Sequence, residues 1–289
     1  MPPLPANGTV GFNGSTRASQ PAPAVLRATA VLGALEHDAP AAVSLAELSR
    51  RLQAAKASLS HVLDALVDAG FVRRAGGGFV LGRRLVELGG AYLAGVDQVG
   101  EFAALTRNLP VASRETVQLS TMVGREVVYL ARHDGMQPLR LGTEVGMRFP
   151  ATCTATGKAM LATLDDAEIA SMFAGYEMPR RTTRSIANLD ELLADLERAR
   201  QRGYAMDDEE ANEGIVCIGL VVPTAPGDEP FGVSVTILKS RLDEAYQAQL
   251  VADLRTLAAS VAHPLGSVSR AGHQASSPPG RPRTATSTP

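Results

Sequence analysis

The stretch SLAELSRRLQAAKASLSHVLDALVDAGFVRRAGGGFVL, residues 44–81, decides the fold of the N-terminal part of the chain. Ser44 and Glu47 have the spacing of a capping box, which opens a helix. Leucines recur at spacings of three and four along it, and a second amphipathic helix follows from about Lys56. Two short apolar runs then flank the glycines at 76–78. We predict two helices joined by a tight turn and followed by a β-hairpin, which is a winged helix-turn-helix.

The outer face of the second helix favours DNA as the partner of this module. It carries small and polar side chains, which fit a major groove and hydrogen-bond base edges. The hairpin adds two arginines that are placed to meet phosphate. The candidate DNA-contacting residues are Lys56, Ala57, Ser58, Ser60, His61, Asp64, Arg73 and Arg74. Because three-helix modules with a hairpin also bind proteins, a protein partner stays open at this point.

Length and composition narrow the class of protein. A chain of 289 residues is long enough for two domains with their own cores. Its apolar runs fall short of the roughly 18–20 residues that span a membrane, and its first residues lack the pattern of a secretory signal. Cys153 and Cys217 lie far apart, which favours free thiols in a reducing compartment. We therefore expect a cytoplasmic protein that does not contact a membrane.

Charge is distributed unevenly along the chain. Residues 20–83 hold seven basic residues against five acidic ones, whereas residues 84–267 hold seventeen against twenty-five. DNA repels an acidic body, so any DNA contact is expected within the N-terminal module. The small positive charge of that module suggests that two copies act together as a dimer.

The rest of the chain divides into a linker, a second domain and two tails. We predict disordered tails over 1–19 and 268–289, because neither holds enough large apolar residues to fold. The DNA-binding domain is assigned to 20–83, a linker helix to 84–100 and an effector-binding domain to 101–267. The linker has an apolar seam at helical spacing, formed by Leu85, Leu88, Tyr92 and Val96.

Beyond residue 116 the apolar period changes from helical to two, which predicts strands. A hairpin is expected around Gly124, a further short strand at 138–142, and a loop that runs into a helix after residue 149. Capping signatures at Asp165 and Asn188 predict two more helices, and a pair of apolar strands precedes a terminal helix over 240–265. Antiparallel strands with segregated helices give an α+β domain.

Two motifs suggest chemistry that their residues do not support. The run TATGKAML resembles a phosphate-binding P-loop, but Thr152 and Ala159 stand where that motif needs Gly and Ser or Thr. The acidic run at 207–210 suggests a metal or acid–base cluster, yet no histidine lies within ten residues of it. We interpret the run as a solvated turn from which one carboxylate can point inward. No cofactor and no metal are expected.

A small-molecule pocket is the more consistent interpretation. Ser234 and Thr236 alternate on one face of a strand, where two hydroxyls need a polar partner. Cys217 lies on the neighbouring strand. Residues 154–157 open a helix whose free N–H groups attract a carboxylate, although they also serve as an ordinary cap. Together they predict a pocket for a small polar molecule that bears a carboxylate.

From about residue 25 to 266 the chain resembles the IclR family of bacterial transcription regulators. The specific segments are FPATCTATGKAMLA, RQRGYAMDDEEANEGIVCIG and SHVLDALVDAGFV, in this order and spacing. The resemblance implies a winged-helix domain, a linker helix that dimerises, and a GAF-like α+β domain that binds an effector. It implies pocket roles, beside Thr154, for Ala155, Thr156, Asp207, Ile215, Cys217, Ser234 and Thr236.

The same resemblance implies a function and shows where this chain departs from the pattern. Family members regulate nearby catabolic operons in response to aromatic or other small acids, as homodimers or tetramers on palindromic double-stranded DNA, without enzymatic activity. Ala57 and His61 stand where the family has more typical recognition residues, including an arginine, so the operator sequence is expected to differ. The alternative is a metabolite-binding protein or enzyme whose N-terminal module binds protein.

Overall fold

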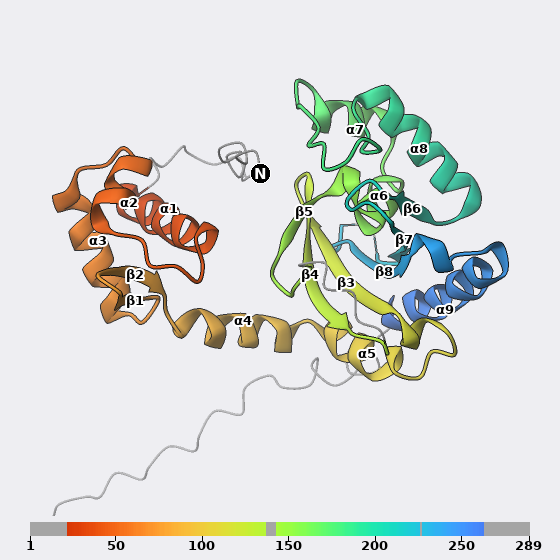
Figure 1. Cartoon of the computed structure of the whole chain (residues 1–289), viewed down its shortest axis with the longest axis horizontal. Coiled ribbons are helices and arrows are strands. Elements are labelled where there is room, and N and C mark those ends of the chain that lie inside the picture. The colour runs from red at the N-terminus through yellow and green to blue at the C-terminus, as the bar shows by residue number, and fades with distance from the viewer. Residues whose placement is uncertain (1–21, 137–142, 226, 263–289) are drawn as a thin grey trace, which may run out of the picture. The chain divides into compact units, whose positions relative to one another are not determined.

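The computed structural model describes residues 22–136, 143–225 and 227–262 (Figure 1). The chain forms two compact units, which divide between Ala91 and Tyr92. The strand predicted at 138–142 and both predicted tails lie outside the described residues.

The first unit is the winged helix-turn-helix that the sequence predicts. It consists of α1 (Pro23–His37), α2 (Leu45–Arg51), α3 (Lys56–Asp68), β1 (Val72–Ala75) and β2 (Gly78–Leu81). Leu48, Leu63 and Phe79 are buried in its core, which joins the three helices to the hairpin. Gly70 ends α3 with φ of +77°, a conformation that glycine adopts without a steric penalty.

The predicted capping box at the start of α2 is only half formed. The Ser44 hydroxyl accepts a hydrogen bond from the Glu47 N–H at 3.2 Å, as predicted. The Glu47 carboxylate, however, binds Arg50 and Arg51 and does not return to the Ser44 backbone. Hydrogen bonds from these two arginines lower the pKa of Glu47 to about 2. Two nearby cations therefore outcompete one backbone N–H for this carboxylate.

The predicted linker is helical, but it is two helices and not one. The first, α4 (Arg84–Gly95), has no buried residue and exposes Val86, Leu88 and Tyr92. The chain then breaks at Val96, and α5 (Asp97–Thr106) packs against the terminal helix of the second unit with Phe102 buried.

A six-stranded antiparallel sheet organises the second unit. Its strands are β3 (Thr116–Val123), β4 (Glu126–His133), β5 (Arg148–Pro150), β6 (Ala205–Asp208), β7 (Ile215–Val222) and β8 (Phe231–Leu238). They lie in the order β5-β4-β3-β8-β7-β6. The predicted hairpin at Gly124 and the predicted pair of apolar strands, β7 and β8, are confirmed. The predicted acidic turn is wrong in part, because residues 205–208 form strand β6 at the sheet edge.

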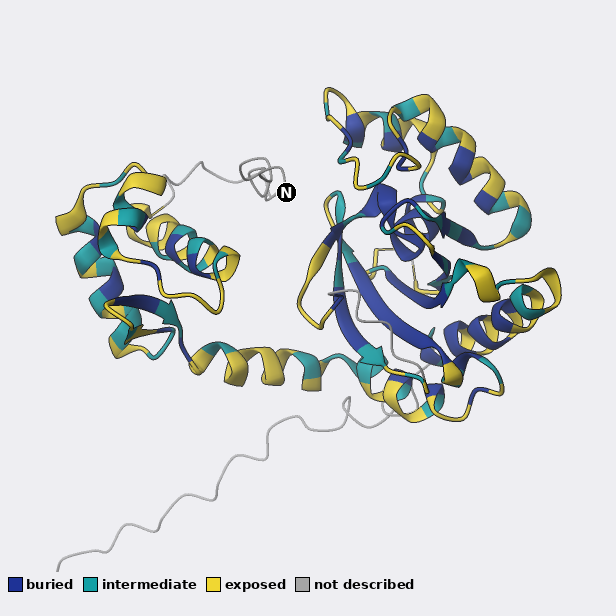
Figure 2. Ribbon diagram, viewed as in Figure 1, coloured by how far each residue is buried: buried dark blue, intermediate teal, exposed yellow. Residues whose placement is uncertain are grey.

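Helices cover both faces of this sheet (Figure 1). On one face lie α5 and α9 (Glu244–Ala262), packed on β4, β7 and β8 over an apolar core. On the other lie α6 (Ala155–Leu161), α7 (Asp166–Phe173) and α8 (Leu189–Arg202), with α6 directly on the strands. Short 3-10 turns are η1 (Ala112–Arg114), η2 (Ala151–Cys153) and η3 (Lys239–Arg241). The central strands are buried on both faces (Figure 2), so the fold is α+β with a fully covered sheet.

The predicted helix caps of this unit are confirmed. Asp165 and Glu168 form a complete capping box at α7. The Asn188 side chain accepts from the Glu191 N–H at the start of α8, and Gly203 ends that helix with φ of +77°. Over the described ranges, none of the helices has both the length and the apolar character that crossing a membrane requires.

Candidate functional site

The predicted DNA-contacting residues lie together on α3 and the hairpin of the first unit. Lys56, Ala57 and His61 are exposed on α3, and Ser58, Ser60 and Asp64 are half-buried beside them. Arg73 and Arg74 are exposed on β1. Because Leu59 and Leu63 turn the opposite side of α3 into the core, this helix presents one polar surface to solvent.

Arg74 is held against α3 by two contacts. Its guanidinium lies 2.6 Å from the Asp64 carboxylate and 4.9 Å from the centre of the Phe79 ring. These contacts fix the hairpin on the helix, and they also occupy Asp64. Among the described residues, Arg73 makes no salt bridge and no cation–π contact. Of the two arginines, it is therefore the one whose guanidinium can bind a phosphate.

Strand register places the other predicted site on one face of the large sheet. Asp207 on β6 lies beside Cys217 on β7, which lies beside Thr236 on β8 and then Thr116 on β3. In the next row, Ser234 lies beside Gln118. Opposed residues of an antiparallel pair point to the same side, so these rows form a polar stripe beneath α6.

The stripe and the start of α6 enclose a small pocket. Seven of the eight residues predicted to bind an effector line it. They are Thr154, Ala155, Thr156, Asp207, Cys217, Ser234 and Thr236. The eighth, Ile215, is buried on β7 but is not among the lining residues. The cavity has a volume of about 20 Å³, which is little more than the space for one water molecule.

The pocket is tight because α6 sits almost on the sheet. A Cβ atom on Gly219 would lie 2.4 Å from the Ala155 carbonyl carbon, a distance that no side chain tolerates. Glycine at this position of β7 therefore lets the backbone of α6 approach the strands. This contact brings Ala155 and Thr156 down to the level of the Cys217, Ser234 and Thr236 side chains.

Asp207 is the charged group of the pocket. Its side chain accepts hydrogen bonds from the N–H groups of Glu210 at 2.7 Å and Ala211 at 3.1 Å, which close a turn after β6. Burial raises the pKa of Asp207 to about 6, and the two backbone N–H groups only partly oppose this rise. A buried carboxylate with this pKa accepts hydrogen bonds from a ligand, and it also repels a ligand's negative charge.

The two cysteines are poor nucleophiles in this structure. Burial raises the pKa of Cys217 well above its usual value, and the nearby Asp207 charge adds to the effect. The Cys217 sulfur lies 3.3 Å from the Thr236 hydroxyl, so it serves as a polar wall of the pocket. Burial likewise raises the pKa of Cys153 to about 11.

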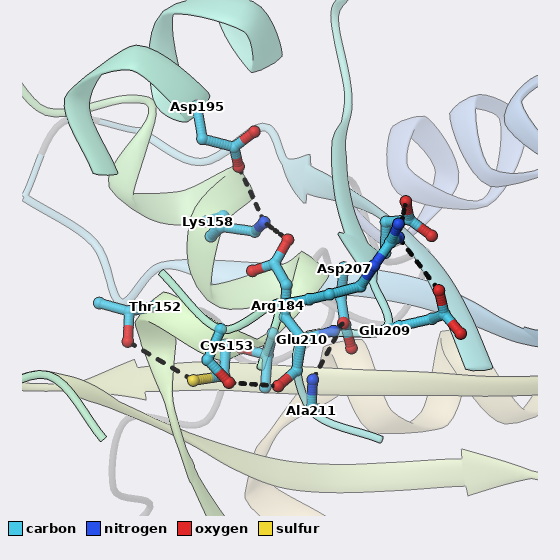
Figure 3. Close-up of polar contacts among 12 residues, drawn as sticks. Thr152, Cys153, Lys158, Arg184, Asp195, Asp207, Glu209, Glu210 and Ala211 are labelled. Carbon is cyan, nitrogen blue, oxygen red and sulfur yellow. Dashed lines mark hydrogen bonds and ion pairs between the residues drawn. The ribbon is translucent and has the colours of Figure 1, made fainter. Parts of the chain in front are cut away.

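Sequence reasoning missed a buried ion cluster behind the pocket (Figure 3). Lys158 on α6 is fully buried, and its ammonium lies 2.5 Å from Glu210 and 2.8 Å from Asp195 on α8. Glu210 follows the Asp207 turn, so the cluster ties α6 and α8 to that turn. Despite the bond to Lys158, burial raises the pKa of Glu210 to about 7. The other two carboxylates of the acidic run, Asp208 and Glu209, bind Arg184 and Lys239 nearer the surface.

Six further lining residues were also missed. They are Gln118, Tyr129, Thr143, Phe149, Ala211 and Asn212. Gln118 could have been predicted from the sequence, because polar and apolar residues alternate along β3 and Gln118 is one of the polar ones. In the sheet it lies beside Ser234. The others come from strands and loops that meet the pocket only through the sheet order. Among the described residues, no group of three or more His, Cys, Asp or Glu side chains has the geometry of a metal site.

A winged helix-turn-helix joined to an α+β domain with a closed polar pocket defines a DNA-binding transcription regulator. Family models support this class over nearly the whole chain. The IclR helix-turn-helix domain matches residues 24–76, and the model described as "Bacterial transcriptional regulator IclR C-terminal" matches residues 90–263. The chain belongs to the IclR family.

Individual relatives agree with this assignment. The chain is 31% identical over 244 residues to the HTH-type transcriptional regulator KdgR of Escherichia coli, covering 84% of this chain and 92% of that protein. An IclR regulator from Alicyclobacillus acidocaldarius has a similar fold, with a TM-score of 0.74, 23% identity and coverage of 83% of this chain and 98% of that one. An IclR homologue from Microbacterium hydrocarbonoxydans, solved with 4-hydroxybenzoate, has a TM-score of 0.68 at 21% identity, with coverage of 83% and 97%. The first two of these proteins are named as transcriptional regulators.

Proposed function

We propose that this protein binds a palindromic operator in the cytoplasm and controls a catabolic operon in response to a small carboxylate or aromatic acid. The observation that carries the effector half of this proposal is the polar pocket beneath α6. Seven residues from four separate segments converge there, and the central ones are almost fully buried. A polar, buried and nearly closed cavity on one face of a sheet is costly to keep unless something polar binds in it.

The DNA half of the proposal rests on the outer face of α3 and on the hairpin. Lys56, Ser60 and His61 supply hydrogen-bonding groups of a size that fits the major groove, and Ala57 leaves room for a thymine methyl group. Arg73 reaches the adjacent phosphates. The arginine that most often reads guanine in such helices is absent from the described face of α3, so hydroxyl, imidazole and methyl contacts carry the base recognition.

A second copy of the chain completes the operator-binding unit. One module supplies few positive charges, whereas two modules on a palindrome double the phosphate contacts. The exposed apolar residues of α4 offer a surface for dimerisation, and the protein acts as a homodimer or a tetramer. An effector that binds one arrangement of the dimer more tightly shifts the spacing of the two α3 helices, and operator affinity changes by the same coupling free energy.

The test is sequencing of genomic fragments that the purified full-length protein captures at physiological salt, with and without a panel of small acids. We expect a few enriched sites that share an inverted repeat, and a change in their enrichment when the effector is present. The neighbouring genes then name the pathway. Capture without sequence preference contradicts the proposed base contacts. If no fragment is captured in any condition, the proposed operator binding is contradicted. A protein partner for the winged helix-turn-helix is then favoured.

A variant with Arg73→Ala and Arg74→Ala checks the role of the hairpin. Binding to every DNA sequence is expected to weaken, and the slope of log K against log salt to fall by up to about 4 for a dimer. An exposed arginine away from this surface, Arg107→Ala, serves as the control. Unchanged affinity and slope in the double variant rule out phosphate contacts by the hairpin.

A further inference from the structure

Among the described residues, no cation lines the pocket, although the pocket holds a buried carboxylate. Polar groups other than Asp207 are hydroxyls, amides and a thiol. An acidic ligand bound only to these groups would place its charge near Asp207 with no compensation, which is unfavourable in a buried site. A ligand carboxylate therefore needs a positive charge within reach of the pocket.

Within the part of the chain that the structure describes, two arginines contact residues of the pocket. Arg132 on β4 donates to the Thr143 carbonyl and hydroxyl at 3.1–3.2 Å, and its charge is already paired with Asp134 at 2.7 Å. Arg181, in the loop between α7 and α8, has its guanidinium 4.7 Å from the centre of the Phe149 ring and donates to the Ala211 carbonyl at 3.3 Å. Phe149 and Ala211 both line the pocket. Arg181 thus lies at the rim and spans two of its walls.

The charge of Arg181 is available to a ligand. Among the described residues no carboxylate lies within 4.0 Å of it, and the residue is exposed. Turning the guanidinium toward a ligand exchanges its contacts with Phe149 and the Ala211 carbonyl for a bond to the ligand carboxylate. The positive charge of Arg181 also acts on residues inside the pocket. Burial raises the pKa of the pocket residue Tyr129, and Arg181 is one of the charges that oppose this rise. The backbone around it is fixed, because the Arg181 N–H donates to the Ser185 hydroxyl at 2.9 Å.

We infer that Arg181 is the specificity-determining residue that selects acidic effectors, binding the ligand carboxylate at the rim while Asp207 accepts a hydrogen bond from a ligand hydroxyl inside. The ligand class is therefore a small hydroxy acid. This inference rests on the proposed effector function of the same pocket.

Arg180 provides a matched control. It precedes Arg181, is also exposed, and lacks a carboxylate within 4.0 Å among the described residues. The hydrogen bond that its guanidinium donates within the described chain goes to the Thr183 carbonyl at 3.4 Å, and Thr183 does not line the pocket. Arg180→Gln and Arg181→Gln therefore remove the same charge from the same loop, and only the second removes it from the pocket rim.

The experiment is isothermal calorimetry on the full-length protein and both variants with three acid–amide pairs. The pairs are 4-hydroxybenzoate and 4-hydroxybenzamide, lactate and lactamide, and glycolate and glycolamide. We expect the unmodified protein and Arg180→Gln to bind at least one acid more tightly than its amide. In Arg181→Gln, affinity for that acid is expected to fall roughly 10- to 100-fold, the value of one hydrogen bond to a charged group, with affinity for the amide unchanged.

Each other outcome overturns the inference. If Arg181→Gln keeps the preference for the acid, another group binds the carboxylate. If amides bind as tightly as acids, the pocket does not select charge. If no acid binds, while genomic capture still finds an operator, the protein is a regulator whose ligand is not a small hydroxy acid. If neither binding nor capture occurs, the proposed function itself fails.

Discussion

The two faces of the six-stranded sheet are built from the same strands and serve opposite purposes. On β3, the residues at 117 and 119 point to α9 and are apolar, whereas Thr116, Gln118 and Ser120 point to the other face and are polar. On β8, Val233 and Val235 alternate with Ser234 and Thr236 in the same way. One face is packed for stability and the other keeps polar groups buried, which is costly unless they are partnered. This difference is why the proposed effector site is assigned to the polar face.

The largest expected effect comes from the charges that support the polar face. In Lys158→Met, Glu210 and Asp195 remain buried without their shared cation, and the free energy of unfolding is expected to fall by about 3–5 kcal/mol. Urea denaturation followed by circular dichroism at pH 7.5 measures the loss. A variant that also carries Asp195→Leu and Glu210→Met is the control, because replacing the whole cluster by apolar groups recovers most of the stability. A loss below about 1 kcal/mol would show that water reaches these carboxylates.

Val235 and Ser234 are adjacent on β8 and point to opposite faces of the sheet, so substituting each one tests one face. Val235→Ala removes a fully buried side chain from the apolar face, and a loss of about 2 kcal/mol in unfolding free energy is expected, with ligand affinity unchanged. Ser234→Ala is expected to do the reverse. It weakens the binding of any acid found by calorimetry about 5-fold, leaves stability almost unchanged, and does not alter operator affinity without ligand. Equal stability losses in both variants would contradict the division of roles between the faces.

The pH dependence of stability also follows from the polar face. Glu210 has a pKa of about 7 in the folded protein against 4.5 as its ordinary value, so the folded state holds this proton more tightly. The contribution of Glu210 to the free energy of unfolding is therefore greatest below about pH 4.5. It is lost as the pH rises through 7, by roughly 1–3 kcal/mol. Asp207 acts in the same direction. Glu210→Gln is expected to flatten the change in unfolding free energy between pH 5 and 7.5, whereas Glu213→Gln, which affects no buried group, is not.

The smallest effect on stability is expected from replacing Thr116, whose hydroxyl lies on the polar face. Thr116 lies in the row of Asp207, Cys217 and Thr236, is 1% exposed, and its hydroxyl has no hydrogen-bond partner among the described residues. Thr116→Val keeps the shape and removes the polar atom, so stability is expected to stay equal or to rise by up to about 1 kcal/mol. Thermal unfolding by calorimetry measures this change. A clear loss would show that the hydroxyl binds a partner such as ordered water.

Periodicity predicted most of the fold and part of the site. The alternation along β3, β7 and β8 is visible in the sequence, and it assigned Ser234 and Thr236 to one face. Strand β6 was missed because two of its four residues are aspartates, which disfavour strands. The break at Val96 was missed because Gly95 looks no different in sequence from Gly89 and Gly90, which α4 accommodates.

The rest of the site depends on contacts that no local pattern encodes. A buried Lys158 runs against the usual exposure of lysine, and only the meeting of α6, α8 and the turn after β6 explains it. The sequence could not decide which of four adjacent acidic residues point inward. In the structure Asp207 lines the pocket and Glu210 binds the buried Lys158. Ile215 shares the face of Cys217 on β7 but lies two residues further along the strand, outside the lining. Arg181 comes from a loop between two helices, where periodicity carries no information.

The narrowness of the pocket has a consequence for how sensitive the protein is to its ligand. A cavity of about 20 Å³ is smaller than a hydroxy acid, so binding requires a conformation in which the pocket is wider. If about one molecule in a hundred is open, the apparent affinity is about a hundredfold weaker than the intrinsic one. Substitutions that loosen the contact at Gly219 would then lower the effector concentration needed for a response without touching any ligand contact. The sensitivity of the regulator is thus set by the packing of one helix as much as by the chemistry of its pocket.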